Sequence, residues 1–340
     1  MRPIPTVNVR RAAMTRAPRA ARQALAAIAS LLVGACGART PGASPAAPSV
    51  TATLPAGAEA VSLLGQVLRA PAMPTASVDA ADAALAANTN DPELLLAAAT
   101  ARATAWRFRE AIALYSRGVE RWPNDARFLR FRGHRYITVR QFEDGARDLD
   151  RAATLDSTNF DIVYHQGLAH FLLGHFDRAA AIYLRCIAFA DNAALRAREA
   201  SGAFRPGYRS CMRMATNDDD RASMTDWAWR SLVRAGRRAE ADRLLAPVRE
   251  AMTINTNRSY YENLLMYKGV RPPEAVLQAA SSDSVRFSTS GYAVAHYYLV
   301  RGDSARAWAL FERVAHGPHW NGFGVIGAEV ELARRRAVGR

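Results

Sequence analysis

The sequence predicts an all-α protein, an α-solenoid of about six to seven stacked antiparallel helix pairs that ends in a capping helix. Two observations carry this prediction. Residues 92–193 divide into three consecutive units of 34 residues, which start at Pro92, Ala126 and Phe160. Small residues and turn formers recur at fixed points of these units. A helix pair of this length cannot bury its apolar face alone, so neighbouring pairs stack and share one core.

The three units agree most closely at the points where the two helices of a pair would cross. Their eighth and twentieth positions hold only small residues: Ala99, Gly133, Gly167, Ala111, Gly145 and Ala179. Their thirty-second position holds the turn formers Pro123, Ser157 and Asp191. The pattern resembles the tetratricopeptide repeat, although the tryptophan often found at the fourth position of that repeat is absent. The resemblance implies a scaffold that binds other proteins and carries no chemistry of its own.

The segments on either side of the three units extend the predicted stack. Residues 58–91 fit the same frame in degenerate form, so 58–193 is expected to form one series of repeats. Residues 194–221 show no repeat pattern and are expected to form an insertion loop. Helix pairs then resume over 222–340, which ends in the capping helix. Glycines spaced 33 residues apart mark the expected turns inside these later pairs: Gly236, Gly269 and Gly302.

Residues 1–35 have the pattern of an export signal, a basic start followed by the short apolar stretch Ala24–Ala35. Met14 is an alternative start that leaves a more ordinary basic region. The run Val33–Cys36 resembles the lipobox of bacterial lipoproteins, in which the cysteine is lipidated and the signal is cleaved just before it. That resemblance makes Cys36 the lipid anchor. It implies a membrane-anchored lipoprotein of a bacterial cell envelope, on the periplasmic side.

The segment that follows the anchor fits this interpretation. After its cysteine, 36–57 consists almost entirely of glycine, alanine, proline, serine and threonine. Such a composition cannot bury a core, so the segment is expected to be a disordered linker. Two alternatives stay open: a plain secretory signal with an incidental Cys36, and a cytoplasmic repeat protein in which the match at Cys36 is accidental.

Cys186 and Cys211 are the only other cysteines. In an exported protein they are candidates for a disulfide, which would pin 194–221 to the third unit. The alternative is that Cys186 is an unbonded small residue at a buried position.

Composition and motifs argue against nucleic-acid binding and catalysis. The net charge is +14, but the arginines are scattered among acidic residues and Lys268 is the only lysine. A solvated basic surface is therefore expected, and no stretch combines clustered basic residues with base-stacking aromatics. We find no phosphate-binding glycine loop, nucleophile elbow or metalloprotease motif. The seven histidines give no predicted metal site. We expect no enzyme activity and no cofactor.

The resemblance also implies where a partner would bind. In tetratricopeptide repeats the first helix of each pair lines the concave surface. In the second and third units the corresponding positions hold mainly basic and aromatic residues: Arg127, Arg130, His134, Asp161, Tyr164, Leu168 and Phe171. Such a groove would suit a peptide with acidic and apolar groups. The alternative is that these residues are ordinary exposed side chains.

Three functions are consistent with the sequence. The first is a lipid-anchored scaffold that mediates protein–protein interaction at a bacterial envelope. The second is a ligand-binding or enzyme-accessory subunit in which 194–221 acts as a lid. The third is a cytoplasmic adaptor built from the same repeats.

Overall fold

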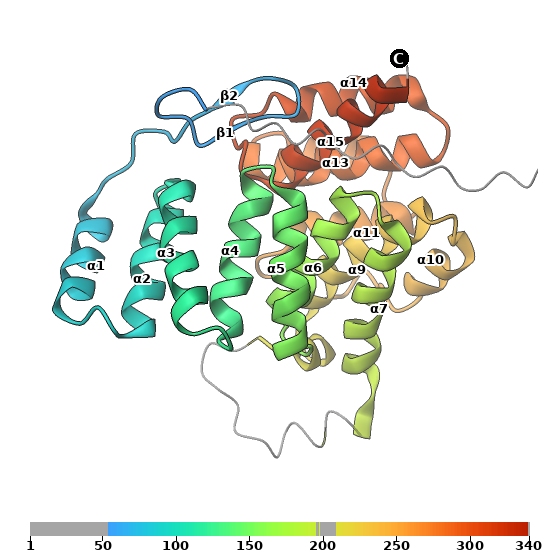
Figure 1. Cartoon of the computed structure of the whole chain (residues 1–340). Coiled ribbons are helices and arrows are strands. Elements are labelled where there is room, and N and C mark those ends of the chain that lie inside the picture. Colours follow the sequence, from blue (N-terminus) through green and yellow to red (C-terminus); the bar gives the residue numbers. More distant parts are fainter. Residues whose placement is uncertain (1–53, 195–196, 198–208, 339–340) are drawn as a thin grey trace, which may run out of the picture. The chain divides into compact units, whose positions relative to one another are not determined.

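The computed structural model describes residues 54–194, 197 and 209–338. Within them, antiparallel helix pairs follow one another along the chain, so the prediction of an all-α solenoid of stacked pairs is confirmed (Figure 1). The expected signal peptide, Cys36 and most of the linker lie outside the described residues. No helix in the described part of the chain is long and apolar enough to cross a membrane.

The helices alternate between the first and the second member of a pair, and neighbouring helices pack against each other. The elements, in chain order, are α1 (Ala76–Ala87), α2 (Pro92–Thr104) with α3 (Phe108–Arg121), α4 (Ala126–Thr138) with α5 (Phe142–Leu155), α6 (Phe160–Leu172) with α7 (Phe176–Asp191), α9 (Asp218–Arg234) with α10 (Arg238–Leu244), α11 (Arg258–Tyr267) with α12 (Pro273–Ala280), α13 (Ser284–Val300) with α14 (Ser304–Ala315), and α15 (Phe323–Val338). The three best units of the sequence are therefore the pairs α2–α3, α4–α5 and α6–α7.

The caps of the first helices repeat with the same spacing. Asp91, Asp125 and Asn159 stand immediately before α2, α4 and α6, and each side chain accepts hydrogen bonds from backbone amides of the first helical turn. A cap of this kind stabilises a helix by about 1 kcal/mol because those amides have no partner inside the helix. The caps therefore fix where each unit begins.

The small residues stand where the helices of a pair come closest. A Cβ atom at Gly133 would lie 2.7 Å from the Leu149 side chain, and one at Gly145 would lie 3.0 Å from the Gly133 carbonyl oxygen. A Cβ atom at Gly167 would lie 2.4 Å from the Tyr183 ring. These crossings leave no room for a larger residue, which explains the small side chains at the eighth and twentieth positions.

The turns inside the first two full pairs contact the C-terminal part of the chain. Trp106, in the α2–α3 turn, packs edge-on against Trp320, with 5.4 Å between the ring centroids. Arg140, in the α4–α5 turn, donates to the Trp320 carbonyl oxygen at 2.8 Å and to Glu329 Oε2 at 3.0 Å. The Arg140 and Glu329 side chains are only 3% and 1% exposed, so their ion pair is buried. The capping helix α15 thus packs on α13 and α14 and also on the first repeats.

Both turn residues adopt a left-handed backbone conformation. The φ angle is 60° at Trp106 and 66° at Arg140, whereas the corresponding residue of the third unit, Gly174, has a φ of 85°. This conformation costs about 1–3 kcal/mol in a residue that carries a Cβ atom. The contacts with Trp320 and Glu329 offset that cost, and a glycine could not make them.

Replacing Gly324 by alanine is expected to lower the free energy of unfolding by about 1–3 kcal/mol. A Cβ atom at Gly324 would lie 2.0 Å from the Ser288 carbonyl oxygen, a backbone atom that no side-chain rotation can move away. Helix propensity alone predicts the opposite sign, a gain of about 0.5–1 kcal/mol. Urea-induced unfolding measures the sign. A variant as stable as the wild type would contradict the close approach of α15 to α13.

The prediction of a divergent helix pair over 58–91 is wrong for the first half of this segment. Ala60–Val61 and Val67–Leu68 form an antiparallel hairpin, β1–β2, and only α1 is helical in this region. Gly65 lies in the connecting loop with a φ of 87°, a conformation that suits glycine. The buried residues of both strands belong to a small core that includes Trp320. The apolar residues of this stretch therefore serve a two-stranded pairing and not a helix face.

The prediction of a loop over 194–221 is wrong for the last part of this segment. The short 3₁₀ helix η1 (Cys211–Ala215) and the first turn of α9, which begins at Asp218, are helical. The backbone amide of Phe160 donates to the carbonyl oxygen of Arg209 at 2.7 Å, which holds this segment beside the start of α6. The acidic run near residue 218 lies in the first turn of α9, where the helix dipole favours negative side chains.

Cys186 and Cys211 are joined by a disulfide, with 5.3 Å between their Cα atoms. The bond ties η1 to α7. The alternative in which Cys186 is an unbonded buried residue is therefore wrong, although its side chain is buried as that alternative required.

Candidate functional site

Basic and aromatic side chains from α4, α6 and α15 meet in a cluster that we call the Arg130 site. Its members are Arg130, His134, Arg135, Asp161, Tyr164, His165 and Phe323. The first helices α4 and α6 belong to adjacent pairs and lie in contact. The rings of His134 and His165 are 4.1 Å apart between centroids. Phe323, at the start of α15, lies 5.3 Å from the first ring and 5.7 Å from the second.

Positive groups outnumber negative ones in the Arg130 site. Arg130 Nη2 lies 3.3 Å from Asp161 Oδ1, and Arg209 Nη1 lies 2.9 Å from the same oxygen. Arg209 also pairs with Asp220, so Arg130, Arg135 and Arg209 face two carboxylates. Arg135 Nη2 lies 2.6 Å from each ring nitrogen of His134, and no described carboxylate pairs with Arg135. The Arg130 side chain is 16% exposed and Asp161 is 23% exposed, so the site retains an opening to solvent.

Burial changes the protonation behaviour of this cluster. It lowers the pKa of Arg135 to about 10 and also lowers the pKa of Arg130. It holds the pKa of His134 and of His165 well below the usual value, and the neighbouring guanidinium groups add to the effect. At neutral pH the histidines are therefore neutral and the arginines charged. Because a positive charge removed from water is costly without a counter-charge, the Arg130 site favours the entry of an anion.

Two of the expected groove residues do not line a groove. Leu168 and Phe171 are both 0% exposed, so the prediction that they face an open groove is wrong. Phe171 packs edge-on against Trp227 of α9, with 5.3 Å between the ring centroids. Tyr164 is 8% exposed, and its hydroxyl accepts a hydrogen bond from Trp227 Nε1 at 2.8 Å. The physical reason is that α9 packs onto α6, where Trp227 covers Phe171 and Tyr164, and Leu168 belongs to the same hydrophobic core.

Arg127 lies on α4 but makes a different set of contacts. It pairs with Glu93 at 2.6 Å and with Asp125 at 2.7 Å, and its side chain is 47% exposed. Such exposed ion pairs contribute about 1 kcal/mol or less. Arg127 therefore matches the alternative of an ordinary surface residue, whereas Arg130 and His134 belong to the site.

Sequence reasoning missed three members of the Arg130 site. Arg135 directly follows His134, and His165 directly follows Tyr164. The repeat pattern had placed His134 and Tyr164 on the concave face. The repeat pattern assigns only certain positions to the concave face, so it excluded Arg135 and His165. One residue along a helix, however, changes the direction of a side chain by only part of a turn. No sequence pattern indicated Phe323, because its contact with α4 and α6 depends on where the capping helix α15 packs against the earlier repeats.

Lowering the pH from 7.5 to 5.5 is expected to destabilise the protein by about 1 kcal/mol for each buried histidine of lowered pKa. Burial lowers the pKa of His134, His165 and His296 well below 6.5. The unfolded chain therefore binds these protons first, so stability is full above pH 6.5 and falls below it. Denaturant unfolding at both pH values measures the loss. His165→Asn should reduce this loss of stability, whereas His316→Asn, which changes an exposed histidine, should not. Equal pH dependence of stability in both variants would contradict the assignment of the loss to the buried histidines.

No protein-family model matches the sequence, and no curated protein matches it. Solved structures with a similar fold include YrrB, described as a TPR protein with an unusual peptide-binding site. The two are 13% identical with a TM-score of 0.39, over 77% of this chain and 100% of that one. The Naa15/Naa10 complex bound to HypK-THB gives 13% identity and a TM-score of 0.33, over 74% of this chain and 36% of that chain.

The TPR domain of P58(IPK) gives 15% identity and a TM-score of 0.29, over 76% of this chain and 69% of that domain. The classification of the present chain rests on its own features: antiparallel pairs, first helices that start at Pro92, Ala126 and Phe160, and close helix crossings at glycines. The chain has the fold of a tetratricopeptide-type α-solenoid.

Proposed function

We propose that the protein is a non-enzymatic scaffold that binds a protein or peptide partner through the Arg130 site. The observation that carries this proposal is the excess of positive charge in a largely buried cluster. Arg130 and Arg209 share the Asp161 carboxylate, and Arg209 also pairs with Asp220, so three arginines face two carboxylates. Among the described residues, Arg135 has a neutral histidine and no carboxylate as its partner. Groups held in so unfavourable a state are typical of functional sites.

The partner group that fits is a carboxylate next to an apolar side chain. The carboxylate would supply the counter-charge that Arg135 lacks, and a charge-assisted hydrogen bond in a dry site is about twice as strong as a neutral one. Phe323 and Phe131 supply the apolar surroundings, since Phe131 lies 4.2 Å below the Arg130 guanidinium. This chemistry corresponds to an acidic peptide with apolar neighbours.

We further propose that the protein is an exported lipoprotein, anchored through Cys36 on the periplasmic side of a bacterial envelope membrane. The sequence of residues 1–36 motivates this proposal. The Cys186–Cys211 disulfide supports it, because disulfides persist in oxidising compartments and are rare in the cytosol. The cytoplasmic adaptor is the competing proposal.

Metabolic labelling with palmitate distinguishes the two locations. We expect the wild type to incorporate label and Cys36→Ser to lose it. Equal labelling of both proteins would remove the lipoprotein proposal and leave the scaffold proposal intact. Of the lid expected over 194–221, residues 195, 196 and 198–208 lie outside the described part of the chain, and 209–221 belong to the segment that the disulfide and η1 hold beside α6 and α7.

Crosslinking in cells tests the scaffold proposal. A partner captured by the wild type should be lost in Arg130→Glu, because the substitution places a second carboxylate beside Asp161. Arg127→Glu, an exposed position on the same helix, is the matched control and should retain the partner. Loss of the partner from both variants, or from neither, would contradict recognition at the Arg130 site.

A further inference from the structure

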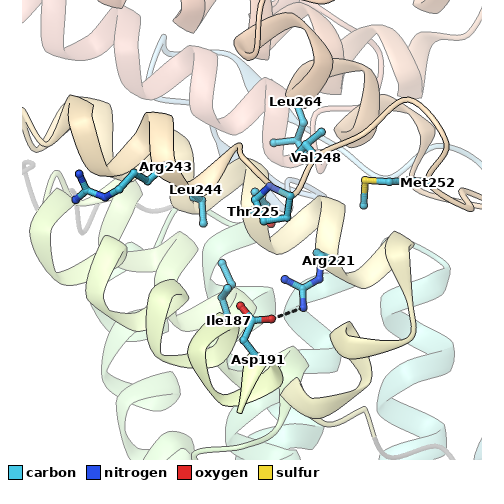
Figure 2. A pocket seen from close by; sticks show the side chains of 10 residues that line it. Ile187, Asp191, Arg221, Thr225, Arg243, Leu244, Val248, Met252 and Leu264 are labelled. Atoms are coloured by element: carbon cyan, nitrogen blue, oxygen red, sulfur yellow. Dashed lines mark hydrogen bonds and ion pairs between the residues drawn. The ribbon is translucent and has the colours of Figure 1, made fainter. Parts of the chain in front are cut away.

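The pair α9–α10 has a short second helix, as does the pair α11–α12, in which α12 has 8 residues. α10 has 7 residues, whereas α3 and α5 have 14 and α7 has 16. After Leu244 the chain continues to α11 through residues 245–257 without a helix. A cavity of about 150 Å³ lies beside this end of α10 (Figure 2). We call it the α10 cavity.

Apolar side chains form most of the wall of the α10 cavity. Figure 2 shows Leu264 and Val248 on one side of it and Ile187 on the other. Met252 and Leu244 complete this wall from the segment after α10 and from its last turn. Four parts of the chain therefore contribute to the apolar wall: α7, α10, the following segment and α11.

Polar groups occupy one side of the same cavity. Arg221 Nη2 donates to Asp191 Oδ1 at 2.6 Å, and Arg221 Nε donates to the Met214 carbonyl oxygen at 2.9 Å. Thr225, which also lines the cavity, is 4% exposed. The opposite charges of Arg221 and Asp191 balance where the two side chains pair. Arg243 also lines the cavity, but it is an exposed residue, so the paired side offers hydrogen-bond donors and acceptors without a net charge of its own.

The walls are fixed before any ligand enters. Asp219 accepts hydrogen bonds from the backbone amides of Asn257 at 2.7 Å and Thr256 at 2.9 Å, which holds the segment after α10 in place. Lys268, the only lysine of the chain, donates to the Ala246 carbonyl oxygen at 3.3 Å. The disulfide at Cys186 ties α7 to η1 one residue before Ile187. A preformed pocket loses less free energy to ordering when it binds.

We propose that the α10 cavity binds a small free molecule with an apolar body of about one ring and a neutral amide or hydroxyl head. An apolar cavity of about 150 Å³ accommodates benzene. The head group would accept from Arg221 and donate to Asp191. A carboxylate would face Asp191 and an ammonium group would face Arg221, so a neutral head fits best. This proposal does not depend on the Arg130 site.

Methyl NMR of the full-length protein in detergent tests the site with benzamide as the probe. We expect titration at millimolar concentrations to shift the methyl signals of Val248, Met252 and Leu264. Leu244→Phe, at a half-buried position of the wall, should fill the cavity and abolish these shifts. Leu184→Phe, at a half-buried position of α7 outside the cavity, should retain them. Circular dichroism checks that both variants are folded. Absent shifts, or equal shifts in both variants, would overturn the proposal.

The affinities of ligands with the same ring and different head groups test the proposed neutral head group. Benzamide should bind at least about fivefold more tightly than toluene, benzoate or benzylammonium, since one or two net hydrogen bonds are at stake. Equal affinity for benzamide and toluene would overturn the assigned head group. A capped tripeptide such as acetyl-Ala-Phe-Ala-amide is expected to bind more weakly than benzamide because a space of about 150 Å³ holds a single ring. Tighter binding of the peptide would overturn the free-molecule assignment in favour of a partner chain.

Discussion

Replacing Glu329 by glutamine is expected to lower the free energy of unfolding by about 3–5 kcal/mol, since it leaves a buried charge without its partner. Arg140 donates to Glu329 Oε2 at 3.0 Å, and the two side chains are 3% and 1% exposed. The same carboxylate accepts the backbone amide of Leu63 at 3.2 Å, which connects the β1–β2 hairpin to α15. Glutamine keeps the shape and removes the charge, so Arg140 remains buried and unpaired.

Urea-induced unfolding measures this loss, with Glu312→Gln as the matched control on the neighbouring helix. The Glu312 side chain is 47% exposed, and its histidine partner lies 3.9 Å away. An exposed pair of this kind contributes about 1 kcal/mol or less. Similar small losses in Glu329→Gln and Glu312→Gln would contradict the docking of α15 on the first repeats through a buried ion pair.

Replacing Cys211 by serine is expected to lower the free energy of unfolding by an amount on the order of 3 kcal/mol. The disulfide joins residues 25 positions apart, and most of its stabilisation comes from restricting the unfolded chain. Cys186→Ser should cost a similar amount, and the double variant should cost little more than either single one, because each change removes the same bond.

Equilibrium unfolding of the three variants under oxidising conditions makes this comparison, and reduced wild type provides the reference. The reduced protein should match the double variant. If the oxidised and reduced wild-type proteins unfolded at the same urea concentration, the disulfide would have no role in stability. An additive loss in the double variant would show that the cysteines act separately.

Local features of the fold were predictable because they depend on short-range physics. The 34-residue spacing placed α2, α4 and α6, whose first residues are Pro92, Ala126 and Phe160. The small residues marked the helix crossings because a close crossing excludes larger side chains. Gly236, Gly269 and Gly302 marked the later turns, where each has a positive φ angle. All of these signals act within one helix pair.

Features that depend on distant contacts were not predictable. Nothing near Glu329 indicates that its partner is Arg140, and nothing near Phe323 indicates that it packs against His134. The hairpin around Gly65 has apolar residues that also fit a degenerate helix, and its pairing is stabilised by Trp320 from the far end of the chain. Sequence periodicity reports the direction of a side chain along a helix and not what covers it.

The candidate site was predictable in part for the same reason. The repeat pattern named Arg130, His134 and Tyr164, which the structure brings together in the Arg130 site. It also named Leu168 and Phe171, which are buried in the hydrophobic core, Phe171 against Trp227 of the first helix of the next pair. A concave position becomes a binding position only where later helices leave it open.

The central claim is that the Arg130 site recognises an anionic group of a partner, and Arg135→Gln tests it most directly. The measurement is the amount of crosslinked partner captured in cells by Arg135→Gln, by the matched variant Arg127→Gln and by the wild type. We expect capture to fall at least about tenfold in Arg135→Gln, as the loss of one charge-assisted hydrogen bond implies, and to persist in Arg127→Gln. Urea unfolding should show that Arg135→Gln is at least as stable as the wild type, because no described carboxylate loses a partner. Undiminished capture by Arg135→Gln would contradict the claim.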